Sequence, residues 1–160
     1  MEFDFIGHVL DVRTSDGRAA ALPLTGGSVA DFHAAVLDTL HDLDLDIRIH
    51  GAPNEMPGAV PFREDLAQRT YAREQAQRFW RVMLQVDRVF KRFRSGYLGK
   101  ASPVHFFWGS FDLAATRFSG RRAPPHPGGV PGLPDAITRE AYSHELSSAG
   151  FWPGGGAVEY

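Results

Sequence analysis

The chain has 160 residues, of which 43% are hydrophobic, and a net charge of −2 at neutral pH. This composition is typical of a globular protein with one hydrophobic core and argues against a disordered chain. No cysteine is present, which excludes disulfides, thiolate nucleophiles and cysteine-ligated metals. We find no signal-peptide pattern and no run of about 18 apolar residues, so we expect a cytoplasmic protein without a membrane anchor.

Charge is unevenly distributed along the chain. Residues 1–50 contain nine acidic residues and three arginines, whereas residues 63–100 contain ten basic and four acidic residues. The two stretches therefore carry net charges of −6 and +6. Charge runs of this kind usually form solvated surfaces, which is the interpretation we favour. A surface for nucleic acid or anionic lipid is the alternative.

The first 50 residues predict strands followed by a helix. Short β-prone runs at residues 3–6, 9–14 and 19–24 predict an antiparallel meander with a tight turn at residues 16–17. Ser28, with an acid three residues later, predicts the start of a helix that runs to about residue 40. Its buried stripe is expected to contain Phe32, Val36, Leu40 and Leu43. The alternation of Ile47 and Ile49 with polar residues predicts a fourth strand over residues 46–50.

The strongest periodicity lies in the middle of the chain. Apolar residues at helical spacing between residues 79 and 93 predict a helix over residues 72–95, about 35 Å long at about 1.5 Å per residue. Residues 104–118 are apolar on both faces and predict a strand covered on both sides, in which Gly109 permits a bulge, a bend or a hairpin. We expect a loop over residues 121–134, a short helix capped by Asp135, and a strand over residues 142–151.

Together these elements predict an α+β fold in one domain over residues 1–160. The expected architecture is an antiparallel, twisted sheet with one long and one shorter helix packed on it.

The C-terminal half carries long motifs that resemble a bacterial family known only as a domain of unknown function. The motifs are SPVHFFWGSFDLA at residues 102–114, TRFSGR at 116–121, APPHP at 123–127, REAYSHE at 139–145 and SSAGFWPG at 147–154. The likeness extends over nearly the whole chain. It implies no activity, substrate or catalytic residue. Because similar proteins continue on both sides, it does imply a fragment or shortened member, incomplete at both ends.

The residues suited to chemistry lie in the last third of the chain, and no P-loop, dinucleotide glycine motif, nucleophile elbow or HExxH motif occurs. Imidazoles and carboxylates transfer protons near neutral pH, and arginines bind carboxylates or phosphates. We expect a catalytic group of His105, His144 and Glu145 and a ligand-binding group of Asp112, Arg117, Arg121 and His126.

Two alternatives to this pocket stay open for these residues. A divalent metal held by His, Asp or Glu is less favoured, because their spacing is not diagnostic. An ordinary hydrogen-bonded or surface position is favoured for each histidine. In an unbroken strand His105 and Asp112 would point to opposite faces, as would His144 and Glu145, and a bulge at Gly109 would bring the first pair onto one face. Ser147 and Ser148 are the least favoured nucleophiles, because no activating partner can be assigned to them.

Two functions are compatible with this sequence. The first is an uncharacterised small-ligand-binding protein or enzyme with a His, Arg and carboxylate pocket in its C-terminal half, for which a small anionic molecule is the expected ligand. The alternative is a noncatalytic interaction module that uses the basic face of the helix over residues 72–95. Nucleic acid is disfavoured, because the aromatic residues between 104 and 115 lack interleaved Lys or Arg and are better explained as core. The residues specify neither a cofactor nor an oligomeric state.

Overall fold

The computed structural model describes residues 1–53, 58–108, 111–130 and 134–154. The chain divides into two compact units, Met1–Arg81 and Val82–Tyr160, and the boundary falls within the long helix α2 (Arg73–Ser95). The fold is α+β, as the sequence predicts. The strands belong to two three-stranded antiparallel sheets, β1-β2-β3 and β4-β5-β6.

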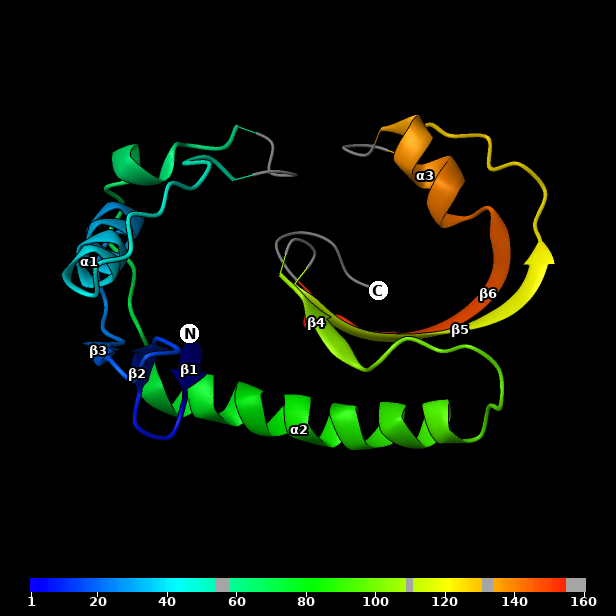
Figure 1. Ribbon diagram of the computed structural model, residues 1–160, viewed down its shortest axis with the longest axis horizontal. Coiled ribbons are helices and arrows are strands. Elements are labelled where there is room, and N and C mark those ends of the chain that lie inside the picture. Colours follow the sequence, from blue (N-terminus) through cyan, green and yellow to red (C-terminus); the bar gives the residue numbers. More distant parts are fainter. Residues whose placement is uncertain (54–57, 109–110, 131–133, 155–160) are drawn as a thin grey trace. The chain divides into compact units, whose positions relative to one another are not determined.

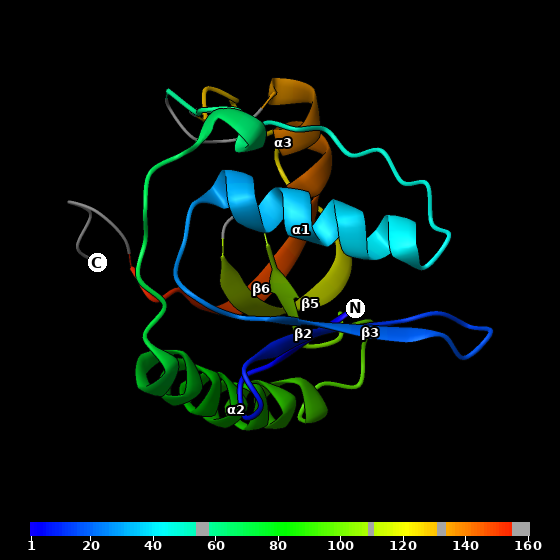
Figure 2. The same cartoon turned by 90° about the vertical axis from the view of Figure 1, so that its left-hand side faces the viewer.

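In the first unit, a β-meander packs against one helix (Figures 1 and 2). Its elements are β1 (Glu2–Asp4), β2 (Val9–Arg13), β3 (Ala19–Pro23), α1 (Val29–Asp42) and a single 3-10 turn, η1 (Phe62–Glu64). Figure 2 shows α1 lying along one face of this meander. Leu10 and Val12 of β2 form its core together with Leu40 and Leu43 from the end of α1, and Leu10 is only 1% exposed.

Local sequence explains where α1 begins and how β2 turns into β3. The Ser28 hydroxyl accepts a hydrogen bond from the Asp31 backbone N–H at 3.0 Å and so caps α1 as predicted. Gly17 adopts a positive φ of 94° in the turn before β3, a conformation that glycine reaches without steric cost.

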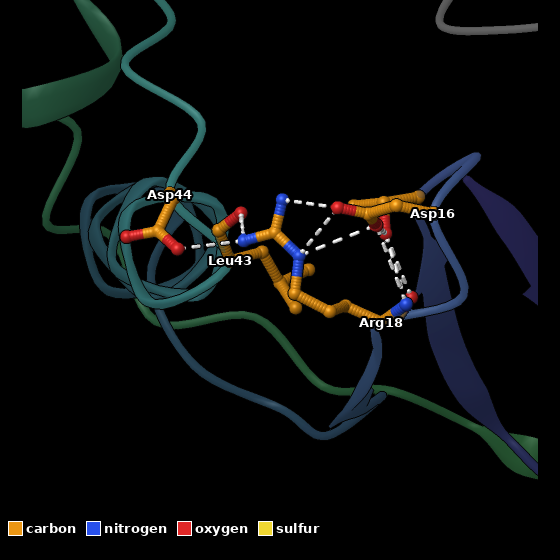
Figure 3. Close-up of polar contacts among 5 residues, drawn as sticks. Asp16, Arg18, Leu43 and Asp44 are labelled. Carbon is orange, nitrogen blue, oxygen red and sulfur yellow. Dashed lines mark hydrogen bonds and ion pairs between the residues drawn. The ribbon is translucent and has the colours of Figure 1, made fainter.

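A salt-bridged arginine joins this turn to the end of α1 (Figure 3). The Arg18 guanidinium bonds the Asp16 carboxylate on one side, with Nε to Oδ2 at 3.0 Å. On the other side, its Nη1 donates to the Leu43 carbonyl at 2.5 Å and to the Asp44 carboxylate at 2.7 Å. Arg18 thus fixes the hairpin against the carbonyl end of the helix, where a cation is favoured by the helix dipole.

Two expectations for the first unit are wrong. Residues 46–50 form no strand, and Ile47 and Ile49 are 47% and 53% exposed. Alternation alone cannot make a strand, because a strand also needs a neighbour with which to pair its backbone groups. Phe32, expected in the buried stripe of α1, is 38% exposed, although Val36, Leu40 and Leu43 pack as predicted.

In the second unit, the C-terminal part of α2 packs on a curved sheet (Figure 1). The sheet contains β4 (His105–Phe107), β5 (Asp112–Arg122) and β6 (His144–Phe151), and α3 (Asp135–Ala141) precedes β6. Phe90 of α2 forms the core with Leu113 and Ala115 of β5.

The expected single strand is instead two antiparallel strands, β4 and β5, with Phe106 paired to Leu113 and Phe107 to Asp112. Gly109 itself lies outside the described residues. The expectation of burial on both faces is wrong. Phe107 is 46% exposed, because α2 packs on the other face, which carries Leu113 and Ala115. Trp108 and Phe111, whose rings contact Phe106, are 67% and 46% exposed.

Two smaller boundaries in the second unit differ from expectation. β5 continues through Arg122, so the irregular segment begins later than predicted. The position before α3 is occupied by Pro134, and Asp135 lies within the first turn, where its carboxylate accepts from the Gly129 backbone N–H at 2.8 Å.

Candidate functional site

The face of β5 and β6 that meets α2 changes from apolar to polar along the strands. Near the helix it carries Leu113 and Ala115, paired with Phe151 and Ala149. Side chains alternate along a strand, so the next position on this face is Arg117. Its cross-strand partner is Ser147, and Ser119 and Glu145 follow on the same face.

A cavity of about 290 Å³ lies over this polar part of the sheet, within the second unit. Its lining includes Tyr97, Arg117, Ser119, Arg121, Glu145 and Ser147. Ligand pockets usually enclose roughly 300–1,000 Å³, so this one suits a molecule of a few heavy atoms.

The segment after α2 is fastened alongside β5 and brings Tyr97 to the cavity. Tyr97 donates its hydroxyl hydrogen to the Phe118 carbonyl at 2.5 Å, and the Phe118 backbone N–H donates to the Lys100 carbonyl at 2.9 Å. The Ser102 backbone N–H also donates to the Thr116 carbonyl at 2.8 Å. These bonds hold one wall of the cavity in place.

Arg117 is a cavity-lining cation whose side chain contacts aromatic rings. Its guanidinium carbon lies 3.6 Å from the centroid of the Phe93 ring and 5.7 Å from that of Tyr97. Nε is buried, and among the described residues no acceptor reaches it and no carboxylate forms an ion pair with Arg117. A buried donor without an acceptor costs about 1–3 kcal/mol. Because the guanidinium also lines the cavity, an anion there would meet a cation that no carboxylate neutralises among the described residues.

The other two charged residues of the cavity bind each other. Arg121 Nε donates to Glu145 Oε2 at 2.7 Å, and the Ser119 hydroxyl donates to the same oxygen at 3.3 Å. The two side chains are 78% and 45% exposed. An ion pair this exposed contributes about 0–1 kcal/mol, so the pair can rearrange when another charged group enters.

Of the seven residues expected to form the site, Arg117, Arg121 and Glu145 line this cavity. The strand pairing puts His105 and Asp112 on one common face, but it is the face opposite Arg117. His144 precedes Glu145 on β6 and so points away from it, and its Nδ1 lies 3.0 Å from the Ser143 hydroxyl.

His126 occupies a different place, in the segment before α3. Its ring stacks on Tyr142 with the centroids 5.0 Å apart, and its Nδ1 accepts from the Gly128 backbone N–H at 3.0 Å. These contacts hold the segment together. His126 is absent from the cavity lining, as are His105, Asp112 and His144.

A metal was the less favoured alternative for these residues. Across the described ranges, no three His, Asp or Glu side chains lie close enough together to hold an ion.

Three lining residues are not among the sequence candidates, namely Tyr97, Ser119 and Leu146. Ser119 lies two residues from both Arg117 and Arg121, a spacing that puts side chains on one face of a strand and could have indicated it. Nothing in the local sequence around Tyr97 indicates that it reaches β5.

The first unit has a larger cavity, of about 370 Å³, between the end of β3, the start of α1 and residues 69–71. Its charged side chains are bonded to neighbours: Asp31 accepts from the Ser28 hydroxyl at 2.6 Å, and Arg69 bonds Asp65 at 2.8 Å. Tyr71 shares a hydrogen bond of 2.9 Å with Nδ1 of the buried His8, and burial raises the pKa of the Tyr71 hydroxyl. Because these groups are already paired, the cavity of the second unit is the stronger candidate.

These features define an α+β protein with a small pocket lined by two arginines and a carboxylate. The chain matches the family of unknown function DUF5996 over residues 1–160 and belongs to that family. No curated protein and no solved structure matches it. None of the helices in the described residues is long and apolar enough to cross a membrane.

Proposed function

We propose that this protein binds a small anionic molecule in the second-unit cavity, with Arg117 as the main anchor. The observation that carries the proposal is a guanidinium that lines a cavity, lies over an aromatic ring and has a buried Nε without an acceptor among the described residues. Arginine presents its N–H groups as a planar fork that matches the oxygens of a carboxylate or phosphate.

The charge of the second unit supports this proposal. Residues 82–160 contain nine Arg or Lys and six Asp or Glu, a net charge of +3. A positive field of this kind raises the local concentration of anions and speeds their association. The Ser147 hydroxyl, paired directly across from Arg117, offers one further donor to a bound oxygen.

The proposal covers ligand binding and no catalytic step. Of the three residues expected to transfer protons, Glu145 lines the cavity, whereas His105 and His144 do not. We also propose that residues 1–160 form a single domain, which the family match over the whole chain supports. We propose a cytoplasmic location as well, as expected from the sequence.

The test compares two arginines of one strand. Arg117→Met removes the anchor but keeps an unbranched apolar stem over Phe93, whereas Arg122→Met makes the same charge change at a position outside the cavity lining. Propionate and inorganic phosphate are titrated into each protein by calorimetry, with circular dichroism as the check on folding.

We expect at least one of these anions to bind the unmodified protein, a loss of tenfold or more in affinity for R117M, and a change below about twofold for R122M. A tenfold loss corresponds to about 1.4 kcal/mol, the scale of one charge-assisted hydrogen bond. If both variants bind as the unmodified protein does, Arg117 is not the anchor. If no anion binds at all, the interaction-module alternative is favoured.

A further inference from the structure

The carboxylate of Glu145 limits which anions the cavity accepts. Glu145 lies two residues from Ser147, the cross-strand partner of Arg117, and so occupies a diagonal position. Diagonal neighbours in a regular sheet are roughly 7–8 Å apart, and their Cβ atoms are somewhat closer. A bound anion on Arg117 therefore lies close to a negative charge. The same charge on Glu145 offsets part of the attraction that Arg117 and Arg121 exert on each negative charge of a ligand.

Glu145 lines the cavity and keeps one carboxylate oxygen that can accept a further hydrogen bond. Both donors that reach it, Ser119 Oγ and Arg121 Nε, bond Oε2. Among the described residues no donor bonds Oε1. The partner on Oε2, Arg121, is 78% exposed, so its side chain can move aside without leaving a buried charge. A ligand that carries its own cation beside its anion would engage both ends of the cavity.

We infer that the ligand is a small zwitterion of the α-amino acid class, its carboxylate bound by Arg117 and its ammonium by Glu145. This inference rests on the proposed function. An α-amino acid has its two charges on neighbouring carbon atoms, a spacing short enough to fit between diagonal neighbours on a sheet. The cavity volume of about 290 Å³ restricts the side chain to a small one.

Three probes that share one carbon skeleton test this inference: L-alanine, L-lactate and propionate, which carry an ammonium, a hydroxyl and a hydrogen at the same carbon. Each is titrated at constant ionic strength into the full chain and into Glu145→Gln. Glu140→Gln serves as the control, because Glu140 is exposed on α3 and lies outside the cavity lining.

We expect L-alanine to bind the unmodified protein and E140Q at least tenfold more tightly than propionate, and E145Q to reduce this advantage to about twofold. Glu145→Asp, which keeps the charge on a shorter stem, should retain part of the preference. Equal binding of L-alanine and propionate, or of L-alanine and L-lactate, would overturn the zwitterion while leaving the anion site intact. Absence of binding by all three probes and by phosphate would instead remove the anion site itself.

Discussion

The guanidinium of Arg117 lies on the ring of Phe93, 3.6 Å from the ring centroid. Phe93 belongs to α2 and Arg117 to β5, so this contact ties the polar end of the sheet to the helix that covers its apolar end. A cation over an aromatic face is stabilised by about 0.5–2 kcal/mol, according to how well it is shielded from water. The ring therefore keeps the charge in one orientation beside the cavity.

Replacing Phe93 with leucine should weaken anion binding without unfolding the second unit. Leucine keeps the site apolar but removes the aromatic face, so the guanidinium loses its support and we expect a three- to tenfold loss in propionate affinity by calorimetry. Phe106→Leu, in the same core cluster, is the matched control and should leave affinity within about twofold. Unchanged binding by F93L would show that the stacking contact does not position Arg117.

Acid should weaken the hairpin next to α1 through Asp16. The Arg18 guanidinium and the Thr14 hydroxyl, which bond this carboxylate, lower the pKa of Asp16 to about 2 from an ordinary value of 3.8. A carboxyl group with a depressed pKa stabilises the fold above its ordinary pKa, and this contribution is lost as the pH falls from about 4 to about 2. Asp16→Asn should therefore be less stable than the unmodified chain at pH 6, and the difference should disappear near pH 2.

Urea unfolding at several pH values measures this difference. Asp4 and Asp65 also have lowered pKa values, owing to backbone hydrogen bonds and to Arg69 respectively, so only the difference between D16N and the unmodified chain isolates Asp16. A difference that stays constant from pH 6 to pH 2 would contradict the role given to the Arg18 contact.

Ser28→Ala should destabilise the first unit by about 1 kcal/mol, the usual cost of removing a helix N-cap. Ser28 is 3% exposed, and loss of its hydroxyl leaves the Asp31 backbone N–H without its acceptor. Ser15→Ala, at an exposed turn position, is the control and should change stability by less than about 0.5 kcal/mol. Equal urea midpoints for the two variants would contradict a stabilising role of the Ser28 hydroxyl at the start of α1.

Leu113→Ala should be far more damaging than Leu98→Ala. Leu113 is 7% exposed in the core beneath α2, and truncation of a buried leucine costs about 2–5 kcal/mol, whereas Leu98 is fully exposed. Thermal unfolding of both variants checks this. A similar midpoint for the two would mean that Leu113 does not lie in a core.

Much of the fold follows from local chemistry in the sequence. The cap at Ser28, the turn glycine Gly17 and the apolar spacing along α2 each determine an element through contacts a few residues apart. The prediction at residues 46–50 failed because pairing depends on a distant strand. The prediction that residues 104–118 are buried on both faces failed because burial depends on packing against a distant element. The helix α2 packs on the face that carries Leu113 and Ala115, and Phe107 on the other face is exposed.

The candidate site was only partly predictable for the same reason. Arg117, Arg121 and Glu145 could be chosen by residue type, but their meeting depends on the β5–β6 register, with its shift between Phe118 and Arg122. The histidines were chosen by type as well, and strand alternation turns His105 and His144 away from the cavity. Tyr97 reaches the cavity only because the segment after α2 bonds to β5.

The most direct test of the central claim is the side-chain Nε–H signal of Arg117 in a nitrogen-15 correlation spectrum, assigned through its loss in Arg117→Lys. During a propionate titration we predict that this signal shifts and saturates with the midpoint found by calorimetry, while the corresponding signal of Arg122 shows no saturable change. An Arg117 signal that stays in place, or that drifts without saturation as those of the other arginines do, would contradict anion binding at this guanidinium.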